Sequence, residues 1–93
     1  MEHSWHLYIL RCRDNTLYTG CTNDLVRRLQ AHNAGKGAKY TKSRLPVSLV
    51  YQESCTDKST ALKREIALKR LTKIKKEALC RQFSETSAPC VND

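Results

Sequence analysis

The sequence contains the side-chain types that hydrolysis of a phosphodiester bond requires. They are two phenols, a guanidinium, an imidazole and a carboxylate, at Tyr8, Tyr18, Arg28, His32 and Glu65. In such a reaction a divalent metal polarises the phosphate and an arginine stabilises developing negative charge, while a phenol or an imidazole handles the proton of the attacking water. These residues are far apart in the chain, so their chemistry depends on the elements that position them.

Arg28 and His32 belong to a stretch whose apolar spacing predicts an amphipathic helix. At about 100° per residue, Leu25 and Leu29 straddle the centre of its buried stripe. Arg27 then points toward solvent, whereas Arg28 lies at the edge of the stripe and His32 follows one turn later on the same flank. Arg28 and His32 can therefore reach over the edge of a sheet. The alternative is that Arg28 covers apolar surface with its methylene stem and that His32 is a cation at the end of the helix.

Glu65 projects inside the apolar arc of another predicted helix. That arc consists of Ala61, Leu62, Ile66 and Leu68. A carboxylate on a core-facing stripe is costly unless a cation compensates its charge. One interpretation is an ion pair with Lys69, one helical turn later. The other is a hard divalent cation, since one carboxylate together with waters and substrate phosphate oxygens is the usual way that Mg²⁺ is held.

Apolar periodicity, turn residues and capping residues together predict an α+β domain. Residues 6–12 and 16–21 predict a β-hairpin. A helix capped by Thr22 or Asn23 follows and extends to about Asn33, with Gly35 as its stop. Residues 34–46 then form a basic loop with room for a short helical turn, and residues 47–53 predict another strand. A helix capped by Asp57 or Ser59 then runs to about Leu71, and a further helix begins at Thr72. The order β-β-α-β-α-α gives a small sheet with helices packed on it. We expect one domain over residues 1–82 and a flexible tail over 83–93.

The register of the hairpin decides whether the two tyrosines share a face. If residues 13–15 form the loop, Tyr8 lies opposite Gly20 and Leu10 lies opposite Tyr18. Both phenol rings would then lie on one side of the sheet, and Gly20 would leave space beside the ring of Tyr8. A loop shorter by one residue would place the tyrosines on opposite faces.

The chain is strongly basic, with 17 Lys and Arg against 9 Asp and Glu and a net charge of +8. One run, 36–44, holds Lys36, Lys39, Lys42 and Arg44 without an acid, and a second run, 58–76, has Glu65 as its only acid. A clustered basic surface suits a polyanion such as nucleic acid. Solubility alone is the alternative explanation.

The cysteines and the apolar runs indicate the cellular setting. The five cysteines form no C-x-x-C pair, so the sequence predicts neither a disulfide framework nor a zinc site, and reduced thiols in a cytoplasmic protein are the simplest account. No signal-peptide pattern and no apolar run of about 18 residues occurs, which predicts a protein that is neither secreted nor membrane-spanning. A chain of 93 residues buries too little surface for a large internal cavity, so we expect a shallow cleft or groove.

Four segments of the sequence, in order, resemble the GIY-YIG nuclease superfamily. His6-Leu7-Tyr8 and Tyr18-Thr19-Gly20 take the places of the two motif strands, and the pattern continues as NDLVRRLQAHN, GKGAKYTKSRLPVSLVY and ALKREIALK. The resemblance covers roughly residues 5–80 and is most specific for the small single-domain bacterial YhbQ-like group. The run AHNAGKGAKYT is also similar to the matching stretch of a structure-specific nuclease of this superfamily.

The resemblance implies roles for matching residues. Tyr8 and Tyr18 correspond to the motif tyrosines, Gly20 to the motif glycine, Arg28 to the catalytic arginine, His32 to a histidine of many members, and Glu65 to the ligand of a single Mg²⁺ or Mn²⁺. It implies an antiparallel three-stranded sheet flanked by helices, and it favours the longer hairpin loop. The first motif lacks its glycine and isoleucine here but keeps the tyrosine.

The resemblance also implies a nucleic-acid surface. The expected contacts are Lys36, Lys39, Tyr40, Lys42, Arg44, Lys69 and Lys73, with Lys69 or Lys73 replacing an asparagine that some members carry. Larger relatives attach a separate targeting domain that this sequence lacks. Substrate choice must therefore come from the basic surface of the core or from a partner protein.

The leading hypothesis is a metal-dependent endonuclease that acts on DNA rather than RNA, on branched or single-stranded substrates, in DNA repair or processing. The second hypothesis is a nucleic-acid-binding module that uses the same fold without turnover. A structural or protein-interaction domain is a third hypothesis, and retention of all the site residues argues against it.

Overall fold

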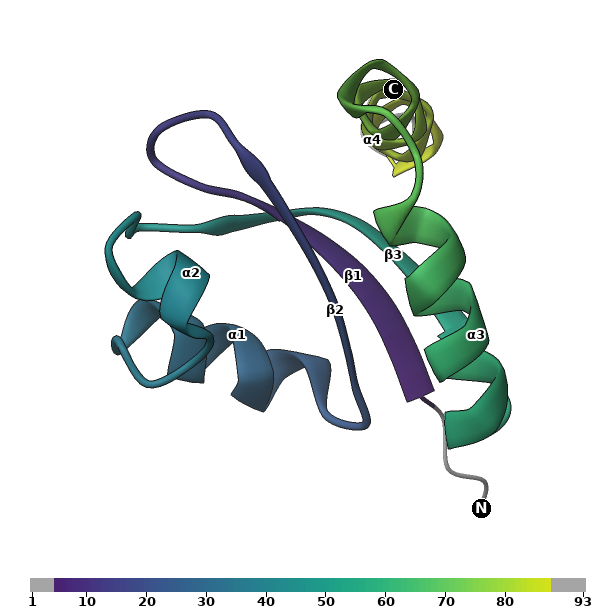
Figure 1. The fold of residues 1–93 in the computed structure, drawn as a ribbon, viewed down its shortest axis with the longest axis horizontal. Helices are drawn as coiled ribbons and strands as arrows, with labels where there is room; N and C mark the ends of the chain where they lie inside the picture. Colours follow the sequence, from purple (N-terminus) through teal and green to yellow (C-terminus); the bar gives the residue numbers. More distant parts are fainter. Residues whose placement is uncertain (1–4, 88–93) are drawn as a thin grey trace.

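A computed structural model describes residues 5–87 of the chain. Strands β1 (Trp5–Arg11), β2 (Leu17–Thr22) and β3 (Ser48–Cys55) form one antiparallel sheet in the order β2-β1-β3. Strand β1 is therefore central, and β2 has one free edge (Figure 1). The predicted α+β fold and its order of elements are confirmed.

The hairpin has the register that the longer loop predicts. The backbone N–H of Cys12 donates to the carbonyl of Thr16 at 2.9 Å, and Asn15 closes the loop with a positive φ of 71°, a conformation that asparagine tolerates. Tyr8 lies opposite Gly20, and Leu10 lies opposite Tyr18. The two tyrosines consequently share one face of the sheet.

The helices cover both faces of the sheet (Figure 1). Helices α1 (Leu25–Asn33) and α2 (Lys39–Lys42) lie on one side, and α3 (Lys58–Lys69) and α4 (Lys73–Ser87) lie on the other. The core beneath α1 contains Tyr8, Leu10, Cys12 and Val47, and the core beneath α3 contains Leu7, Ala61 and Leu68. Because side chains alternate along β1, consecutive residues feed opposite cores.

Capping residues set the helix boundaries. Asp24, rather than the predicted Thr22 or Asn23, caps α1, because its carboxylate accepts a hydrogen bond from the backbone N–H of Arg27 at 3.2 Å. Asp57 caps α3, as one of the two predicted options, and Gly35, with a φ of +79°, follows the end of α1 as predicted.

Helix α4 continues to Ser87, beyond residue 83 where the sequence analysis places the start of the tail. The rest of that expected tail, 88–93, lies outside the described residues. None of the helices in the described part of the chain is long and apolar enough to cross a membrane.

The predicted apolar arc of α3 is partly wrong. Ala61 and Leu68 are fully buried, but Leu62 is 41% exposed and Ile66 is 54% exposed. The helix packs across a sheet of only three strands, and a narrow stripe of its surface meets the core. Glu65 lies between the buried positions on this stripe and is half-buried.

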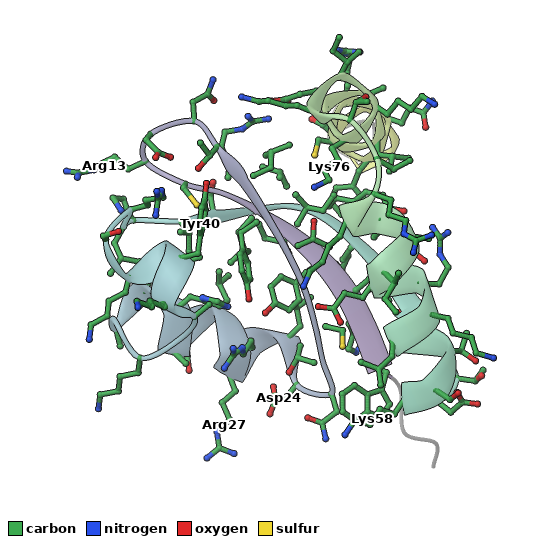
Figure 2. All side chains as sticks on the ribbon, viewed as in Figure 1. Arg13, Asp24, Arg27, Tyr40, Lys58 and Lys76 are labelled. Atoms are coloured by element: carbon green, nitrogen blue, oxygen red, sulfur yellow. The ribbon has the colours of Figure 1, made fainter. Side chains whose placement is uncertain are left out.

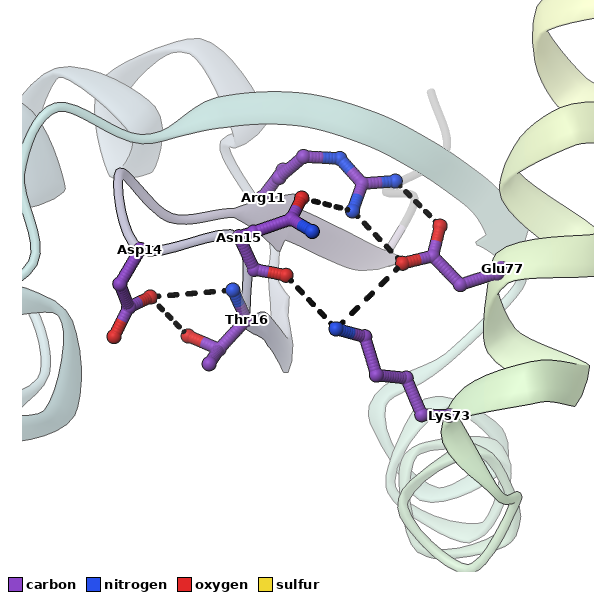
Figure 3. A network of polar contacts seen from close by, with 6 residues as sticks. All are labelled: Arg11, Asp14, Asn15, Thr16, Lys73 and Glu77. Atoms are coloured by element: carbon purple, nitrogen blue, oxygen red, sulfur yellow. Dashed lines mark hydrogen bonds and ion pairs between the residues drawn. The ribbon is translucent and has the colours of Figure 1, made fainter.

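Polar contacts join α4 to the hairpin (Figure 3). The guanidinium of Arg11 donates to both carboxylate oxygens of Glu77, at 2.6 and 2.8 Å, and also to the side chain of Asn15. The ammonium of Lys73 donates to the backbone carbonyl of Asn15 at 3.1 Å. The loop end of the hairpin and the start of α4 are thereby held together.

Candidate active site

The hydroxyl of Tyr8 lies between two side chains of α1. Nε of Arg28 donates to it at 3.3 Å, and Nε2 of His32 lies 3.1 Å from it. Arg28 and His32 are one helical turn apart, so both reach the same hydroxyl over the sheet. Tyr8 and His32 are 1% and 0% exposed, which makes this a buried cluster under the helix.

The hydrogen bonds around His32 assign its tautomer. Nδ1 of His32 lies 2.8 Å from Oγ1 of Thr41, and that hydroxyl donates its only proton to the carbonyl of Ala38 at 3.0 Å. Nδ1 must therefore carry the proton and donate to Thr41. In a neutral imidazole Nε2 then has a free lone pair, so Tyr8 donates its hydroxyl proton to His32.

Burial sets the ionisation of this pair. Burial raises the pKa of Tyr8 above that of a free phenol, although the neighbouring Arg28 guanidinium opposes the shift. Burial also lowers the pKa of His32, and the positive charge of Arg28 lowers it further. Both groups are thus held neutral near pH 7, with a ready-made hydrogen bond along which a proton can pass.

Two glycines make room for the cluster. A side chain at Gly20 would place its Cβ 2.5 Å from the hydroxyl oxygen of Tyr8, so the Tyr8 ring crosses β2 directly over this glycine. A Cβ at Gly37 would collide with the imidazole ring of His32. The space that Gly20 leaves is therefore not open, as we expect from the sequence, but is filled by the phenol ring of Tyr8.

The second tyrosine lies beside the first. The ring of Tyr18 has its centroid 6.5 Å from that of Tyr8 and 5.4 Å from that of His32. Arg28 is close to both phenols, and its pKa is raised mainly by the hydrogen bond to Tyr8, with a smaller contribution from Tyr18. Four of the five predicted site residues are therefore gathered on one face of the hairpin.

Glu65 approaches β2 from the other face. Its carboxylate accepts a hydrogen bond from the thiol of Cys21 at 3.5 Å and lies 3.2 Å from the ammonium of Lys69. Cys21 directly follows Gly20, so only the width of strand β2 separates Glu65 from the hydroxyl of Tyr8. No hydrogen bond among the described residues joins Glu65 to the tyrosine cluster. The ion pair with Lys69, one of the two interpretations of this carboxylate, is present.

The donor set around Glu65 suits a magnesium ion bound mostly by solvent and substrate. No group of three or more His, Cys, Asp or Glu side chains occurs within residues 5–87, so a cage made only of protein ligands does not fit there. A single carboxylate does fit, because Mg²⁺ keeps several waters and often takes the remaining ligands from phosphate. Lys69, at 3.2 Å, shows that this carboxylate already attracts a cation.

Arg28 also borders a surface depression at the start of α1. The depression has a volume of about 450 Å³ and is lined by Thr22, Asn23, Asp24, Arg27, Arg28 and Ala31. Arg27 is exposed and, as predicted, points away from the sheet (Figure 2). A phosphate in this depression would meet both guanidinium groups.

Some of the residues predicted to contact nucleic acid are exposed, whereas others are already engaged in contacts within the protein. Lys36, Lys39 and Lys42 are exposed around α2. Arg44 instead forms an ion pair with Asp14 at 3.0 Å and covers the ring of Tyr40 at 3.9 Å. Lys69 and Lys73 likewise have acidic partners, Glu65 for Lys69 and Glu77 for Lys73.

Thr41 and Gly37 are the site residues that the sequence reasoning missed. Thr41 is fully buried and orients His32, while Gly37 lets the loop backbone pass over the imidazole ring. Both lie in the run GKGAKYT of the basic loop. A glycine and a threonine in such a run were the features of the sequence that could have indicated a close contact of the loop with the site.

The fold and the site define a class of protein. A three-stranded sheet presents a hydrogen-bonded phenol, imidazole and guanidinium on one side of its edge strand and a lone carboxylate on the other, which is an arrangement suited to acid–base chemistry on an anionic substrate. The chain belongs to the GIY-YIG family, because the model of that family, the GIY-YIG catalytic domain, matches residues 4–78.

Similar proteins of comparable length confirm the predicted membership among small single-domain members. A UPF0213 protein of Cupriavidus pinatubonensis is 45% identical, over 91% of this chain and 94% of its own length. A UPF0213 protein of Desulfotalea psychrophila is 52% identical, over 82% of this chain and 70% of its own length.

Two solution NMR structures share the fold. The UPF0213 protein BH0048 of Bacillus halodurans has a TM-score of 0.55 and 42% identity, over 85% of this chain and 84% of its own. The protein EF2693 of E. faecalis has a TM-score of 0.59 and 40% identity, over 89% of this chain and 91% of its own.

Proposed function

We propose that this protein is a metal-dependent endonuclease that hydrolyses phosphodiester bonds in DNA, with branched or single-stranded DNA as its substrate and DNA repair or processing as its role. The observation that carries this proposal is the hydroxyl of Tyr8, held between Arg28 and His32 at 3.3 and 3.1 Å. Membership in the GIY-YIG family supports it at the level of the nuclease family.

The proton of the attacking water would pass through Tyr8 to His32. The Tyr8 oxygen accepts one hydrogen bond from Arg28 and keeps a second lone pair, which can accept a water proton while the phenol proton moves to Nε2. His32 then becomes an imidazolium that Thr41 holds through Nδ1. Tyr8 is buried in the free protein, so Arg28 must turn from the hydroxyl toward the scissile phosphate when substrate binds.

Arg28 would stabilise the negative charge that develops on the phosphate. Arg28 lines the depression at the start of α1, where a phosphate would enter from solvent. Glu65 would hold Mg²⁺ or Mn²⁺, which supplies Lewis-acid polarisation of the phosphate when bound. Tyr18 would line the path of the substrate between these groups.

The second candidate is a nucleic-acid-binding module without turnover. The pairing of Glu65 with Lys69 favours it, because an ammonium at 3.2 Å already neutralises the carboxylate that would hold the metal. In that case the basic surface is retained but the residues of the tyrosine cluster are dispensable for binding.

Single-turnover cleavage tests the proposal. The wild type is incubated with duplex, flap, fork and single-stranded DNA and RNA in the presence of Mg²⁺ or Mn²⁺, beside the variants Glu65→Ala and Arg28→Ala. We expect divalent-dependent cleavage by the wild type, loss of it in Glu65→Ala, and a decrease of roughly 100- to 1,000-fold in Arg28→Ala. Affinity for the DNA should change little.

Arg27→Ala is the matched control, because Arg27 carries the same charge on the same helix but does not contact Tyr8. Because Arg27 also lines the depression, we expect its loss to weaken binding and to slow the cleavage of bound DNA far less than Arg28→Ala does. Equal cleavage by the wild type and Glu65→Ala would refute the proposal. Salt-dependent binding without products on any substrate would instead support the binding module.

A further inference from the structure

A second depression crosses the free edge of β2. It has a volume of about 300 Å³ and is lined by Leu17, Tyr18, Thr19, Tyr40, Lys69 and Lys76. These residues come from β2, α2, α3 and α4, so the depression joins the two faces of the sheet. Figure 2 shows Tyr40 and Lys76 on either side of β2. The volume is at the lower limit of small-molecule sites, which have roughly 300–1,000 Å³.

One side of this depression is aromatic. The rings of Tyr18 and Tyr40 are nearly parallel, with an angle of 19° and centroids 6.1 Å apart, and Tyr40 is 38% exposed. Arg44 covers the Tyr40 ring at 3.9 Å and donates to its backbone carbonyl, but Arg44 does not line the depression. Arg44 therefore lies over one face of the Tyr40 ring, and the depression meets this ring on its Tyr18 side.

The opposite side is cationic. Lys76 is half-buried and has no ion-pair partner among the described residues, while Lys69 is paired with Glu65. Thr19 is 97% buried, since its exposed fraction is 3%, and its hydroxyl has no hydrogen-bond partner in the described part of the chain. A ligand that joins a flat ring to an anionic group matches this combination of neighbours.

We propose that this depression binds one unpaired nucleotide of the substrate strand, with its base stacked against Tyr40 and its phosphate on Lys69 and Lys76. A base inside a duplex has its faces covered and its edge paired, so only an unpaired base can lie against Tyr40. Tyr18 belongs both to this depression and to the tyrosine cluster, so the nucleotide adjoins the scissile bond. This inference rests on the proposed function and explains why branched or single-stranded DNA would be selected.

Fluorescence of 2-aminopurine tests the proposal without any cleavage. Forked oligonucleotides carry this base at successive positions of the unpaired arm and are bound to the full chain in EDTA. We expect quenching at one position near the junction, absent in Tyr40→Leu and kept in Tyr40→Phe. The affinity of Tyr40→Leu should fall roughly 5- to 150-fold, the range for one base–aromatic stack.

Two further variants test the cationic side. Lys76→Met should weaken binding and lower the salt dependence by about one phosphate contact. Lys75→Met is its matched control, because Lys75 is an exposed neighbour that does not line the depression. Equal effects of these variants, or equal quenching by the wild type and Tyr40→Leu at every position, would overturn the proposal. Circular dichroism verifies that each variant is folded.

Titration with dAMP separates a nucleotide of a strand from a free nucleotide. The variant Tyr40→Trp reports on both ligands through its own fluorescence, and we expect quenching at much lower concentrations of the fork than of dAMP. Equal concentration dependence would assign the depression to free nucleotides and overturn the proposal. Because these measurements need no metal and no products, they can succeed where the nuclease test fails, and the reverse also holds.

Discussion

At the scale of single residues, the most unusual group is a histidine with no exposed surface. His32 lies between the hydroxyls of Tyr8 and Thr41, at 3.1 and 2.8 Å, and the hydrogen bond to Thr41 places a proton on Nδ1, so that Nε2 of the neutral imidazole accepts from Tyr8. A charged imidazole here would give up its hydration without gaining a carboxylate partner, since its hydrogen-bond partners are the hydroxyls of Tyr8 and Thr41 and the nearby charge is the like charge of Arg28. His32 is therefore held as a neutral base rather than as a cation.

This arrangement predicts loss of stability in mild acid. Burial lowers the pKa of His32 below its ordinary value of 6.5. The unfolded chain consequently binds more protons below that value, so the free energy of unfolding falls as the pH drops from 6.5 through the lower pKa of the folded state. Urea unfolding over this pH range should show the loss in the wild type and a smaller loss in His32→Gln. An NMR titration that places the pKa of His32 at or above 6.5 would contradict the prediction.

Sequence reasoning predicted where the candidate site residues lie better than it predicted their surroundings. Alternation and loop length were enough to oppose Tyr8 and Gly20, and helix geometry was enough to separate Arg28 from Arg27. The burial of His32 was not predictable in this way, because it depends on the path of the loop that brings Thr41 over α1. Helical periodicity carries no information about that path.

At the scale of elements, the edge strand β2 is the point where the two halves of the candidate site meet. Helix α1 brings Arg28 and His32 to one face of it, and α3 brings Glu65 to the other. The family resemblance predicted Glu65 as a metal ligand, whereas its position beside Cys21 and its distance from Lys69 became visible only in the fold. The arc of α3 was mispredicted because periodicity alone does not show how narrow the sheet is.

Lys69 is expected to compete with a metal ion for Glu65. The variant Lys69→Met lacks the ammonium that lies 3.2 Å from a carboxylate oxygen of Glu65. That oxygen is then free to bind a metal ion, and a positive charge that would repel the ion is gone. Exposed ion pairs contribute about 0.2–1 kcal/mol, so the affinity for Mn²⁺ should rise by roughly 1.5- to 5-fold. Paramagnetic broadening of NMR signals from α3 and β2 in the free protein measures this.

Lys63→Met is the control for charge alone, because Lys63 is exposed on the same helix and is not paired with Glu65. An equal gain in Mn²⁺ affinity in both variants would show that Lys69 acts only through the general field. Glu65→Gln should abolish the broadening at these positions.

The attachment of α4 to the hairpin depends on a partly exposed ion pair. Arg11 and Glu77 are 29% and 27% exposed and share two hydrogen bonds. Glu77→Gln keeps the shape of the side chain but removes its charge, and should lower the free energy of unfolding by about 0.5–1 kcal/mol. Hydrogen exchange should accelerate in α4 more than in α3, and equal acceleration in both helices would contradict a local role.

This ion pair also predicts an acid-sensitive contribution to stability. Arg11 lowers the pKa of Glu77 below its ordinary value of 4.5. The contribution is therefore complete above 4.5 and disappears as the pH falls through the lower pKa of the folded state. Glu77→Gln should lack this part of the pH dependence in urea unfolding.

At the scale of the whole molecule, the net charge of +8 is divided between fixed and free cations. Arg11, Arg44 and Arg64 are engaged with Glu77, Asp14 and Glu53, respectively. Lys36, Lys39 and Lys42 are exposed in and just before α2, the helix that also carries Tyr40. Composition predicted a polyanion partner, but only the fold separates the cations that hold the protein together from those available to bind a phosphate backbone.

The salt dependence of DNA binding should identify the surface that contacts the backbone. Each phosphate contact contributes about 0.7–0.9 to the slope of log affinity against log salt concentration. Replacing Lys36, Lys39 and Lys42 with Gln should therefore reduce that slope by about 2–3. Replacing Lys63, Lys75 and Arg81 with Gln removes the same charge from exposed positions of α3 and α4, and should reduce the slope by less than one contact. Fluorescence anisotropy with a forked oligonucleotide in EDTA measures both slopes. If the two triple variants lose equal slope, the DNA responds to net charge alone, and the loop around α2 is not its docking surface.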